Sequence, residues 1–547
     1  MEPAHQSQCA ALPPVSGRVR AALSVTLALA AGLALRLWMM KEFFEVNGDS
    51  NIYGELAKNL LQKGCYGLTQ ANGQMHPTLM RLPGYPLFLA LCFRVFGIEN
   101  YAPAVWVQIA LDLVACLLLA GFVHRVAPPA LRNGAAHSTL WLAALCPFTA
   151  LYAVQPLTEA PTIFCIALAL WSAACFRARP AWSAALAFTF AATCAALLRP
   201  DGALVALALA PALLITLRKR NRPSPAPAQM PAAPGLDFQT WETPNPNQIH
   251  LSHHKPSRSW SHRRWPGAPS MNRPLIQRWD TAIPAHPHPI RIALVCLLLA
   301  LAPFAAWTVR NWQVFHVFQP LAPRYANDPG QAIYPGWQRW FKSWSLDFVS
   351  TYDVYWQIPG NPLDLGKLPS RAFDSPQQYA ETAALAADYN QIDNGLDILP
   401  ELDARFARLA DARIASHPWR SHVWLPLGRV ADMWLRPRVE NLPIDLDWWV
   451  YAHHNQETRF SWAYAALNAV YLLLGIAGLC LRPRLWLSML AYMLLRSAML
   501  LTIEAPEARY TIECFPILFA LAGVALYRST NTVCLSVFRR KASAGKG

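Results

Sequence analysis

Long apolar runs constrain the fold of this chain more than any other feature of its sequence. Only 14% of its 547 residues are charged and 54% are apolar, whereas soluble proteins contain roughly 25% charged residues. A helix needs about 20 apolar residues to cross about 30 Å of hydrocarbon. We therefore expect an all-α polytopic membrane protein with about ten transmembrane helices. The segments that meet or approach this length test are residues 21–40, 102–124, 138–154, 160–176, 181–198, 201–217, 291–310, 461–480, 485–502 and 511–527.

Basic residues between these segments predict which ends face the cytoplasm, because cytoplasmic loops hold an excess of Lys and Arg. The run from Gly84 to Gly97 is only fourteen residues long and carries Arg94, so we interpret it as an interfacial or re-entrant helix. We expect a multi-pass protein of the bacterial inner membrane with cytoplasmic N- and C-termini and an uncleaved first segment. With the N-terminus inside, the inner loops contain Arg125, Arg132, Arg177, Arg179, Arg482, Arg484 and Arg528.

Two long stretches lie outside the apolar segments. From Arg218 to Arg291 there are fourteen prolines and eleven Lys or Arg against three Asp or Glu. This composition favours a disordered basic cytoplasmic linker near anionic lipid over a nucleic-acid site. The second stretch, residues 311–460, contains thirteen basic and seventeen acidic residues, and we expect it to be a folded, mostly helical outer-face region.

Patterns within that region predict three helices. Helical patterning covers residues 379–389 and 397–415, and Pro418 to Leu435 mixes Trp and Leu with Arg and Asp, as in an interfacial helix. The resulting divisions are an N-terminal transmembrane catalytic half (1–217) with its first outer loop (41–101), the Pro-rich linker (218–290), a transmembrane helix (291–310), the periplasmic region (311–460), and C-terminal transmembrane helices with a basic tail (461–547).

Asp49 is the first candidate for chemistry, since the sequence has none of the common metal, dinucleotide, serine-hydrolase or ATPase signatures. It follows the first apolar segment by nine residues and should lie close to the outer membrane surface. A partly desolvated carboxylate there would have a raised pKa, in the range useful for a general base. Alternatively, Asp49 or Ser50 simply caps the amphipathic helix expected over residues 51–62. Position alone leaves both readings open.

Three further ionisable residues lie at or within the apolar segments. Glu159, in Pro-Leu-Thr-Glu, falls at the outer end of a span and is a site candidate, because charge at membrane depth is costly. Asp112 and Arg496 lie deeper, where a polar contact between helices is the simpler interpretation. Those two side chains could pair with each other.

Four arginines gather on the predicted outer face, against the positive-inside rule. Guanidinium groups bind phosphate through two parallel charge-assisted hydrogen bonds, so together they indicate a phosphate site. Individually, each could instead pair with a neighbour such as Asp201 or Glu507. The four are Arg81, Arg199, Arg310 and Arg509.

Taken in order, short motifs along the chain resemble a known family. They are N-G-D-S-N-I-Y-G-E-L-A-K-N-L-L from Asn47, R-L-P-G-Y-P-L-F from Arg81, P-L-T-E at 156–159, L-R-P-D-G at 198–202, W-T-V-R-N at 307–311 and E-A-R-Y at 507–510. Their order and spacing resemble the family-39 type of glycosyltransferases with the GT-C fold, a group that includes protein O-mannosyltransferases and bacterial aminoarabinose transferases. The resemblance covers most of the chain outside the linker.

This resemblance implies that Asp49 acts at the catalytic centre and that Glu159 is a second acid there, although the family more often has Asp at that place. It implies a polyprenyl-phosphate sugar donor bound by the arginines, inversion at the anomeric carbon, and a lipid, protein or glycan acceptor. The chain lacks the acidic pair beside Asp49 that some members have, so its dependence on a divalent metal cofactor stays open. Other side chains of the motifs are assigned to substrate binding: Tyr53, Tyr85, Asn311 and Tyr510.

A transporter or flippase of lipid-linked sugars is the main alternative, since it would also be polytopic and use outer arginines. Such proteins place their substrate sites near the bilayer midplane and often have repeated halves, whereas these candidate charges gather at one face. A membrane scaffold is a third possibility, but it leaves the ordered motifs unexplained. The partners we expect are a sugar donor, its acceptor and membrane lipids, with no nucleic acid.

Overall fold

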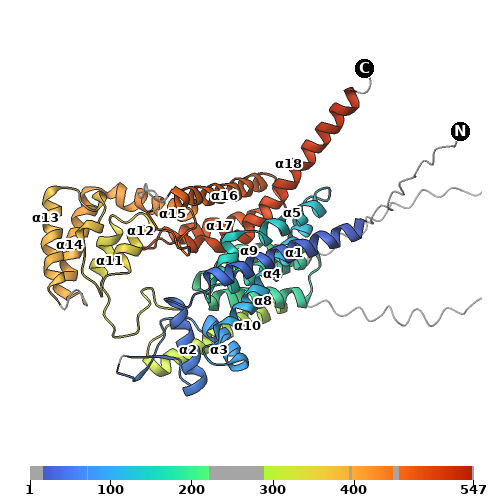
Figure 1. Ribbon diagram of the computed structural model, residues 1–547. Helices are drawn as coiled ribbons and strands as arrows, with labels where there is room; N and C mark the ends of the chain where they lie inside the picture. The colour runs from blue at the N-terminus through green and yellow to red at the C-terminus, as the bar shows by residue number, and fades with distance from the viewer. Residues whose placement is uncertain (1–16, 71, 221–288, 393–396, 448–454, 545–547) are drawn as a thin grey trace, which may run out of the picture.

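Helices make up nearly all of the regular structure in the computed structural model (Figure 1), which describes residues 17–70, 72–220, 289–392, 397–447 and 455–544. Within these ranges the only strands are the short pair β1 (Gly67–Thr69) and β2 (Met75–Pro77), which run antiparallel with Leu68 opposite His76. Nearly all of the predicted linker, residues 221–288, lies outside the described residues.

Seven helices are long and apolar enough to cross a membrane, so the chain is an all-α polytopic membrane protein as its apolar runs predict. The predicted segments 181–198 and 485–502 form the shorter apolar helices α8 (Trp182–Leu198) and α17 (Trp486–Leu500). The seven are α1 (Gly17–Phe43), α4 (Tyr101–Val126), α7 (Glu159–Ala178), α9 (Leu204–Arg220) with the 3-10 turn η1 (Pro200–Ala203), α10 (Pro289–Phe315), α16 (Asn455–Cys480), and α18 (Phe515–Ala544) with the 3-10 turn η6 (Ala508–Cys514).

The predicted single span over residues 138–154 is wrong. The chain forms two helices there, α5 (Arg132–Ala144) and α6 (Pro147–Ala153), with a break at Leu145 and Cys146. Pro147 explains the break: it has no N–H to donate and its ring clashes with the preceding turn, whereas the first turn of a new helix accommodates it.

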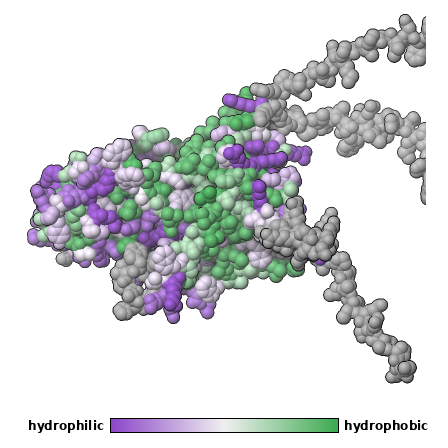
Figure 2. Space-filling view, turned by 90° about the horizontal axis from the view of Figure 1, so that it is seen from above, coloured by the Kyte–Doolittle hydropathy of each residue, from purple (hydrophilic) through white to green (hydrophobic). Residues whose placement is uncertain are grey.

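Close packing of small residues holds the centre of the bundle together. A Cβ on Gly523 of α18 would lie 2.0 Å from Thr139 Oγ1 of α5, and one on Gly478 of α16 would lie 2.0 Å from Leu521 O. Small residues allow helix backbones in a membrane to approach closely in this way. The apolar stretch of α18 is therefore mostly buried, while that of α10 is mostly exposed. The face of the bundle seen in Figure 2 is mostly apolar.

The predicted first outer loop folds into α2 (Asp49–Lys63), the strand pair and α3 (Gly84–Phe96). α2 confirms the predicted amphipathic helix and packs against α3. In the predicted interfacial run, α3 buries Leu89 and Phe93 while Leu91 and Val95 are each 65% exposed, so one face is apolar and uncovered. A Cβ on Gly84 would lie 2.5 Å from the Leu197 backbone, which brings the start of α3 against the end of α8.

The described part of residues 311–460, the predicted outer-face region, forms a hydrophilic lobe beyond one end of the bundle (Figures 1 and 2). Its core includes Trp337, Trp340, Trp344 and Phe406. Two of its helices confirm the predicted patterning over 379–389 and 397–415, and residues 418–435 form one helical run that includes a π-turn. The elements are α11 (Pro335–Lys342), α12 (Phe348–Ser350), η2 (Thr351–Tyr355), η3 (Leu365–Lys367), η4 (Ser370–Ala372), α13 (Pro376–Asn390), α14 (Pro400–Ser416), η5 (Arg420–Trp424) and α15 (Leu425–Leu435).

Candidate active site

Two arginines bind the carboxylate of Asp49, the first residue of α2. Arg81 Nη2, from the loop before α3, donates to Asp49 Oδ1 at 2.7 Å. Arg509 Nη1, from η6, donates to Oδ2 at 3.2 Å. The three side chains are each between 22% and 26% exposed, so they are reachable from outside. Each carboxylate oxygen is therefore held by a different guanidinium group.

The alternative that Asp49 or Ser50 caps α2 is wrong. The N-cap of α2 is Gly48, which makes no side-chain capping bond. Ser50 Oγ instead donates to Pro156 O at 3.0 Å, which ties α2 to the loop before α7. The carboxylate of Asp49 is thus directed at the arginines.

The pKa of Asp49 differs from expectation too. Burial alone would raise it, but the positive charges of Arg509 and then Arg81 outweigh burial, so the pKa of Asp49 is lowered from its ordinary value of 3.8. The sequence predicted a raised pKa because it showed desolvation without showing that two cations contact the same carboxylate. Asp49 is therefore ionised and paired in this structure.

Glu159 and Arg199 form a second layer beneath Asp49. Arg199 Nη1 donates to Glu159 Oε1 at 2.9 Å; the side chain of Glu159 is 1% exposed and that of Arg199 15%. The ring of Tyr510 joins the layers, because the guanidinium carbons of Arg199 and Arg509 lie 5.5 and 5.6 Å from its centroid. Such contacts are favourable cation–π interactions.

A third layer is almost completely buried, with side chains 10% exposed or less. Arg496 Nη1 of α17 lies 2.6 Å from Glu513 Oε2 and 2.8 Å from Asp201 Oδ2. Glu513 in turn meets Arg199 Nε at 2.8 Å, so the layer continues into the second one. Arg496 Nε also donates to Tyr510 O at 2.9 Å, which fixes η6 where it carries Arg509.

The predicted pairing of Asp112 with Arg496 is therefore wrong, although both make polar contacts between helices as expected. Asp112 of α4 accepts from Arg36 Nε of α1 at 2.7 Å, and Arg36 also donates to Ala144 O at 2.8 Å. Glu513 and Arg36 were missed by sequence reasoning. Each is an ionisable residue within a predicted span, and that signal alone could have identified them.

Arg310 and Asn311 lie in a different setting. Arg310 donates to Thr78 O and Tyr66 O, each at 2.8 Å, and its guanidinium carbon lies 5.1 Å from the Trp307 ring centroid. The fully buried Asn311 donates to Gln319 O at 2.8 Å. The Arg310 bonds fasten α10 to residues that flank the strand pair. Among the described residues, neither side chain forms a hydrogen bond or ion pair with Asp49 or Glu159.

Of the candidate tyrosines, Tyr53 and Tyr510 lie beside the charged residues. Burial, and next the negative charge of Asp49, raises the pKa of Tyr53 to about 12, so its phenol stays neutral. Tyr85 is fully buried, packs edge-on against Tyr53 with centroids 5.0 Å apart, and donates to Gln108 Oε1 at 2.6 Å. The buried Tyr85 therefore fixes the position of the Tyr53 ring.

The described residues do not offer a ready metal site. No group of three or more His, Cys, Asp or Glu side chains within the described ranges is placed to hold a metal ion, and the guanidinium groups already bind both oxygens of Asp49.

One known family matches a part of the chain that includes three residues of the site. Residues 75–227, somewhat more than a quarter of the chain, match the family described as dolichyl-phosphate-mannose-protein mannosyltransferase. This match confirms the resemblance to membrane glycosyltransferases of the GT-C type over this part of the chain. It spans Arg81, Glu159 and Arg199, whereas Asp49 and Arg509 lie outside it and join the site through the contacts above.

Particular solved structures are similar at a lower level. ArnT from Cupriavidus metallidurans in the apo state is 15% identical, with a TM-score of 0.34, and the alignment covers 93% of this chain and 78% of that one. The same protein bound to undecaprenyl phosphate gives 14% identity, a TM-score of 0.33, and coverage of 94% and 78%. None of the curated proteins compared with the chain matches it.

Proposed function

We propose that this protein transfers a sugar from a polyprenyl-phosphate donor to an acceptor hydroxyl on the non-cytoplasmic face of the membrane, with inversion and with Asp49 as general base. One observation carries the proposal: Arg81 and Arg509 meet on the single carboxylate of Asp49 at the partly exposed top of a layered charge cluster. The family matched by residues 75–227 is described by a dolichyl-phosphate sugar donor, which is chemically a polyprenyl phosphate.

The donor phosphate competes with Asp49 for the arginines. Arg81 is the better candidate to move. Among the described residues, its side chain forms a hydrogen bond or ion pair with Asp49 alone, and its Nε is buried without a hydrogen-bond partner. Arg509 is held more firmly, since its Nε also lies 2.5 Å from Glu507. When the phosphate recruits Arg81, Asp49 Oδ1 becomes free.

The freed carboxylate then removes the proton from the acceptor hydroxyl as that oxygen attacks the anomeric carbon. The bond between this carbon and the phosphate oxygen breaks, the polyprenyl phosphate leaves, and a single displacement inverts the configuration. General-base assistance contributes roughly 10²- to 10⁴-fold in rate. The guanidinium groups stabilise the negative charge that grows on the departing phosphate.

Glu159 acts in this scheme as a positioning residue. Its carboxylate is buried and accepts from Arg199 Nη1, so it holds Arg199 against Tyr510 and thereby supports Arg509. The sugar and the acceptor are not encoded in these contacts. The charges converge at one end of the bundle, whereas a flippase would need them near the bilayer midplane, where transporters bind their substrates. This position disfavours a flippase.

Purified protein in detergent, given a panel of polyprenyl-phosphate sugars and acceptors, should release polyprenyl phosphate without a sealed bilayer. Asp49→Asn should lower this rate by roughly 10²-fold or more, the scale of general-base catalysis, while its yield and thermal stability stay near wild type. Glu42→Gln is the matched control, because it also replaces a carboxylate by its amide. Glu42 is exposed and lies six residues before Gly48, so this variant should keep full activity. Full activity of Asp49→Asn would remove Asp49 from the mechanism.

A further inference from the structure

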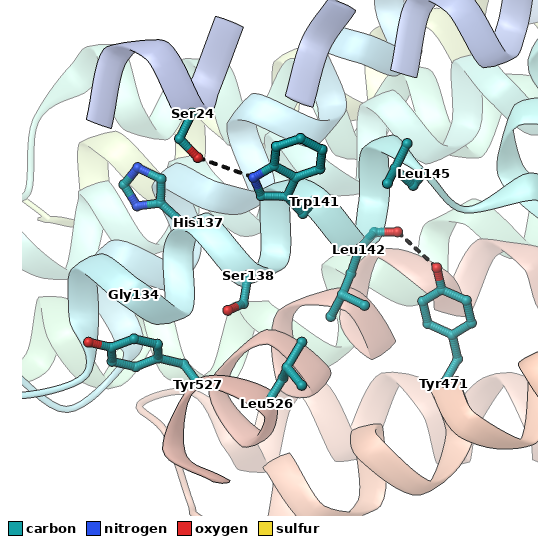
Figure 3. A pocket seen from close by; sticks show the side chains of 10 residues that line it. All are labelled: Ser24, Gly134, His137, Ser138, Trp141, Leu142, Leu145, Tyr471, Leu526 and Tyr527. Atoms are coloured by element: carbon teal, nitrogen blue, oxygen red, sulfur yellow. Dashed lines mark hydrogen bonds between the residues drawn. The ribbon is translucent and has the colours of Figure 1, made fainter. Parts of the chain in front are cut away.

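An apolar groove lies away from the Asp49 site, between α1, α5, α16 and α18 (Figure 3). Its volume is about 430 Å³. Ser24 lines it nineteen residues before the end of α1 at Phe43, which is roughly 28 Å along the helix at about 1.5 Å per residue. The groove is therefore a separate feature. Its lining consists of Ser24, Gly134, His137, Ser138, Trp141, Leu142, Leu145, Tyr471, Leu526 and Tyr527.

Carbon surfaces dominate the walls, because the neighbouring polar groups bond to one another. Trp141 Nε1 donates to Ser24 Oγ at 3.1 Å, and the hydroxyl of Tyr471 donates to Leu142 O at 3.0 Å (Figure 3). The ring of Tyr527 lies against Gly134, where a Cβ would approach it to 2.0 Å. Leu145 is 43% exposed, so the groove opens outward on a bundle whose surroundings are lipid. An apolar chain fits such walls.

The bundle end near this groove is strongly basic. Arg484 N donates to Val126 O at 2.9 Å, which places the loop after α16 beside the end of α4. Arg20 precedes Ser24 by one helical turn and is exposed, and Arg132 begins α5 two residues before Gly134. Within the described residues, segments 113–158 and 514–544 contain no Asp or Glu. These segments therefore supply no carboxylate to neutralise Arg20, Arg132 or Arg484.

His137 supplies a polar atom at the edge of the groove. Its Nδ1 lies 2.8 Å from Asn133 O, and because a carbonyl can only accept, Nδ1 carries the hydrogen. Its Nε2 is then buried without a hydrogen-bond partner among the described residues. His137 lies one turn before Trp141 in α5, between Trp141 and Arg132 at the start of the helix.

We propose that the groove binds one acyl chain of an anionic phospholipid, whose headgroup lies among Arg20, Arg132 and His137. Basic pockets between transmembrane helices bind anionic lipid headgroups by this combination of charge and apolar surface. The apolar walls accept the chain and the basic end selects the charge. This site does not depend on the proposed transferase activity.

Native mass spectrometry of the full-length protein, incubated with phosphatidylglycerol or with phosphatidylcholine, tests the proposal. Wild type should retain phosphatidylglycerol preferentially. Arg20→Gln and Arg132→Gln should each lower that preference by about fivefold, the scale of one basic residue at an anionic surface. Ser138→Phe, which fills the groove, should lower retention of phosphatidylglycerol itself.

Two control variants separate the groove from general effects. Leu473→Phe adds similar bulk on the outward face of α16, where Leu473 is 65% exposed, and Lys41→Gln removes an exposed charge at the other end of α1; both should bind as wild type does. Equal retention of the two lipids by wild type would overturn the proposal. So would unchanged retention in Arg20→Gln and Ser138→Phe, or displacement of phosphatidylglycerol by an equal concentration of undecaprenyl phosphate.

Discussion

At the scale of single residues, the basicity of Asp49 depends on the two arginines that bind its carboxylate. Its carboxylate is ionised but paired, and its pKa lies below 3.8 because Arg509 and Arg81 outweigh the effect of burial. Carboxylates with lowered pKa values are weak bases. Donor phosphate that neutralises these arginines would raise the pKa of Asp49, so the base would gain strength when the substrate is present.

Arg81→Gln should move the acid limb of the pH profile of kcat/KM to higher pH. The sign follows from the contacts: Arg81 lowers the pKa of Asp49, and burial, which raises it, stays in the variant. Activity is lost as pH falls through the pKa of a base, and kcat/KM reports the free enzyme. We expect the limb of wild type to lie below the ordinary pKa of a carboxyl group, because the two arginines lower the pKa of Asp49, and the limb of the variant to lie at higher pH.

Release of polyprenyl phosphate, measured across pH for each variant, gives these profiles. Arg94→Gln is the control, since Arg94 is exposed on α3 and should leave both the rate and the limb unchanged. A limb at the same pH in wild type and Arg81→Gln would mean that another group sets the acid dependence.

At the scale of elements, the buried ion pairs lock the ends of several helices together. Arg496 of α17 binds Glu513 of η6 and Asp201 of η1, and Glu513 continues to Arg199 at the end of α8. These carboxylates are 10% exposed or less. Removal of one partner from a buried pair leaves an uncompensated charge and costs about 3–5 kcal/mol.

Arg496→Met should therefore lower the melting temperature of the purified protein clearly, and the double variant Arg496→Met with Glu513→Gln should recover part of the loss by removing one stranded charge. Thermal unfolding in detergent measures both. Lys58→Met is the control, because its ion pair with Glu99 is 35% and 51% exposed and exposed pairs contribute about 0–1 kcal/mol. If Arg496→Met and Lys58→Met melt together, the buried cluster does not stabilise the fold.

Most elements could be predicted from the sequence, because lipid and water impose separate patterns. Long apolar runs predicted the spans, and amphipathic patterning predicted α2, α13 and α14. The break before Pro147 was missed because composition was averaged across it, although proline at that place is a recognisable signal.

The site could be predicted as a set of charges but not as a set of pairs. Asp49 and Arg509 are 460 positions apart and meet only through packing of η6 on the bundle. Arg310 shares its sequence signal with the other arginines, an outer position beside aromatic residues, yet it binds backbone carbonyls. Which partner an arginine takes depends on tertiary contacts that neither spacing nor composition records.

At the scale of the whole molecule, the bundle has two chemically different ends. One carries the paired acids and arginines of the candidate site together with the hydrophilic lobe (Figure 2). The other carries arginines at the start of α1 and α5 and after α16. Since cytoplasmic loops hold the excess of basic residues, this asymmetry predicts that the Asp49 site faces away from the cytoplasm.

Reporter fusions test that orientation. Alkaline phosphatase, which is active only outside the cytoplasm, should be active when it is inserted after the exposed Asn72 in the turn between β1 and β2. A fluorescent protein, which matures in the cytoplasm, should fluoresce when it is fused after Gly547. An inactive phosphatase at Asn72 would place Asp49 beside the cytoplasmic pool of nucleotide sugars. A lipid-linked donor would then be unnecessary, because the arginines could bind a soluble diphosphate instead.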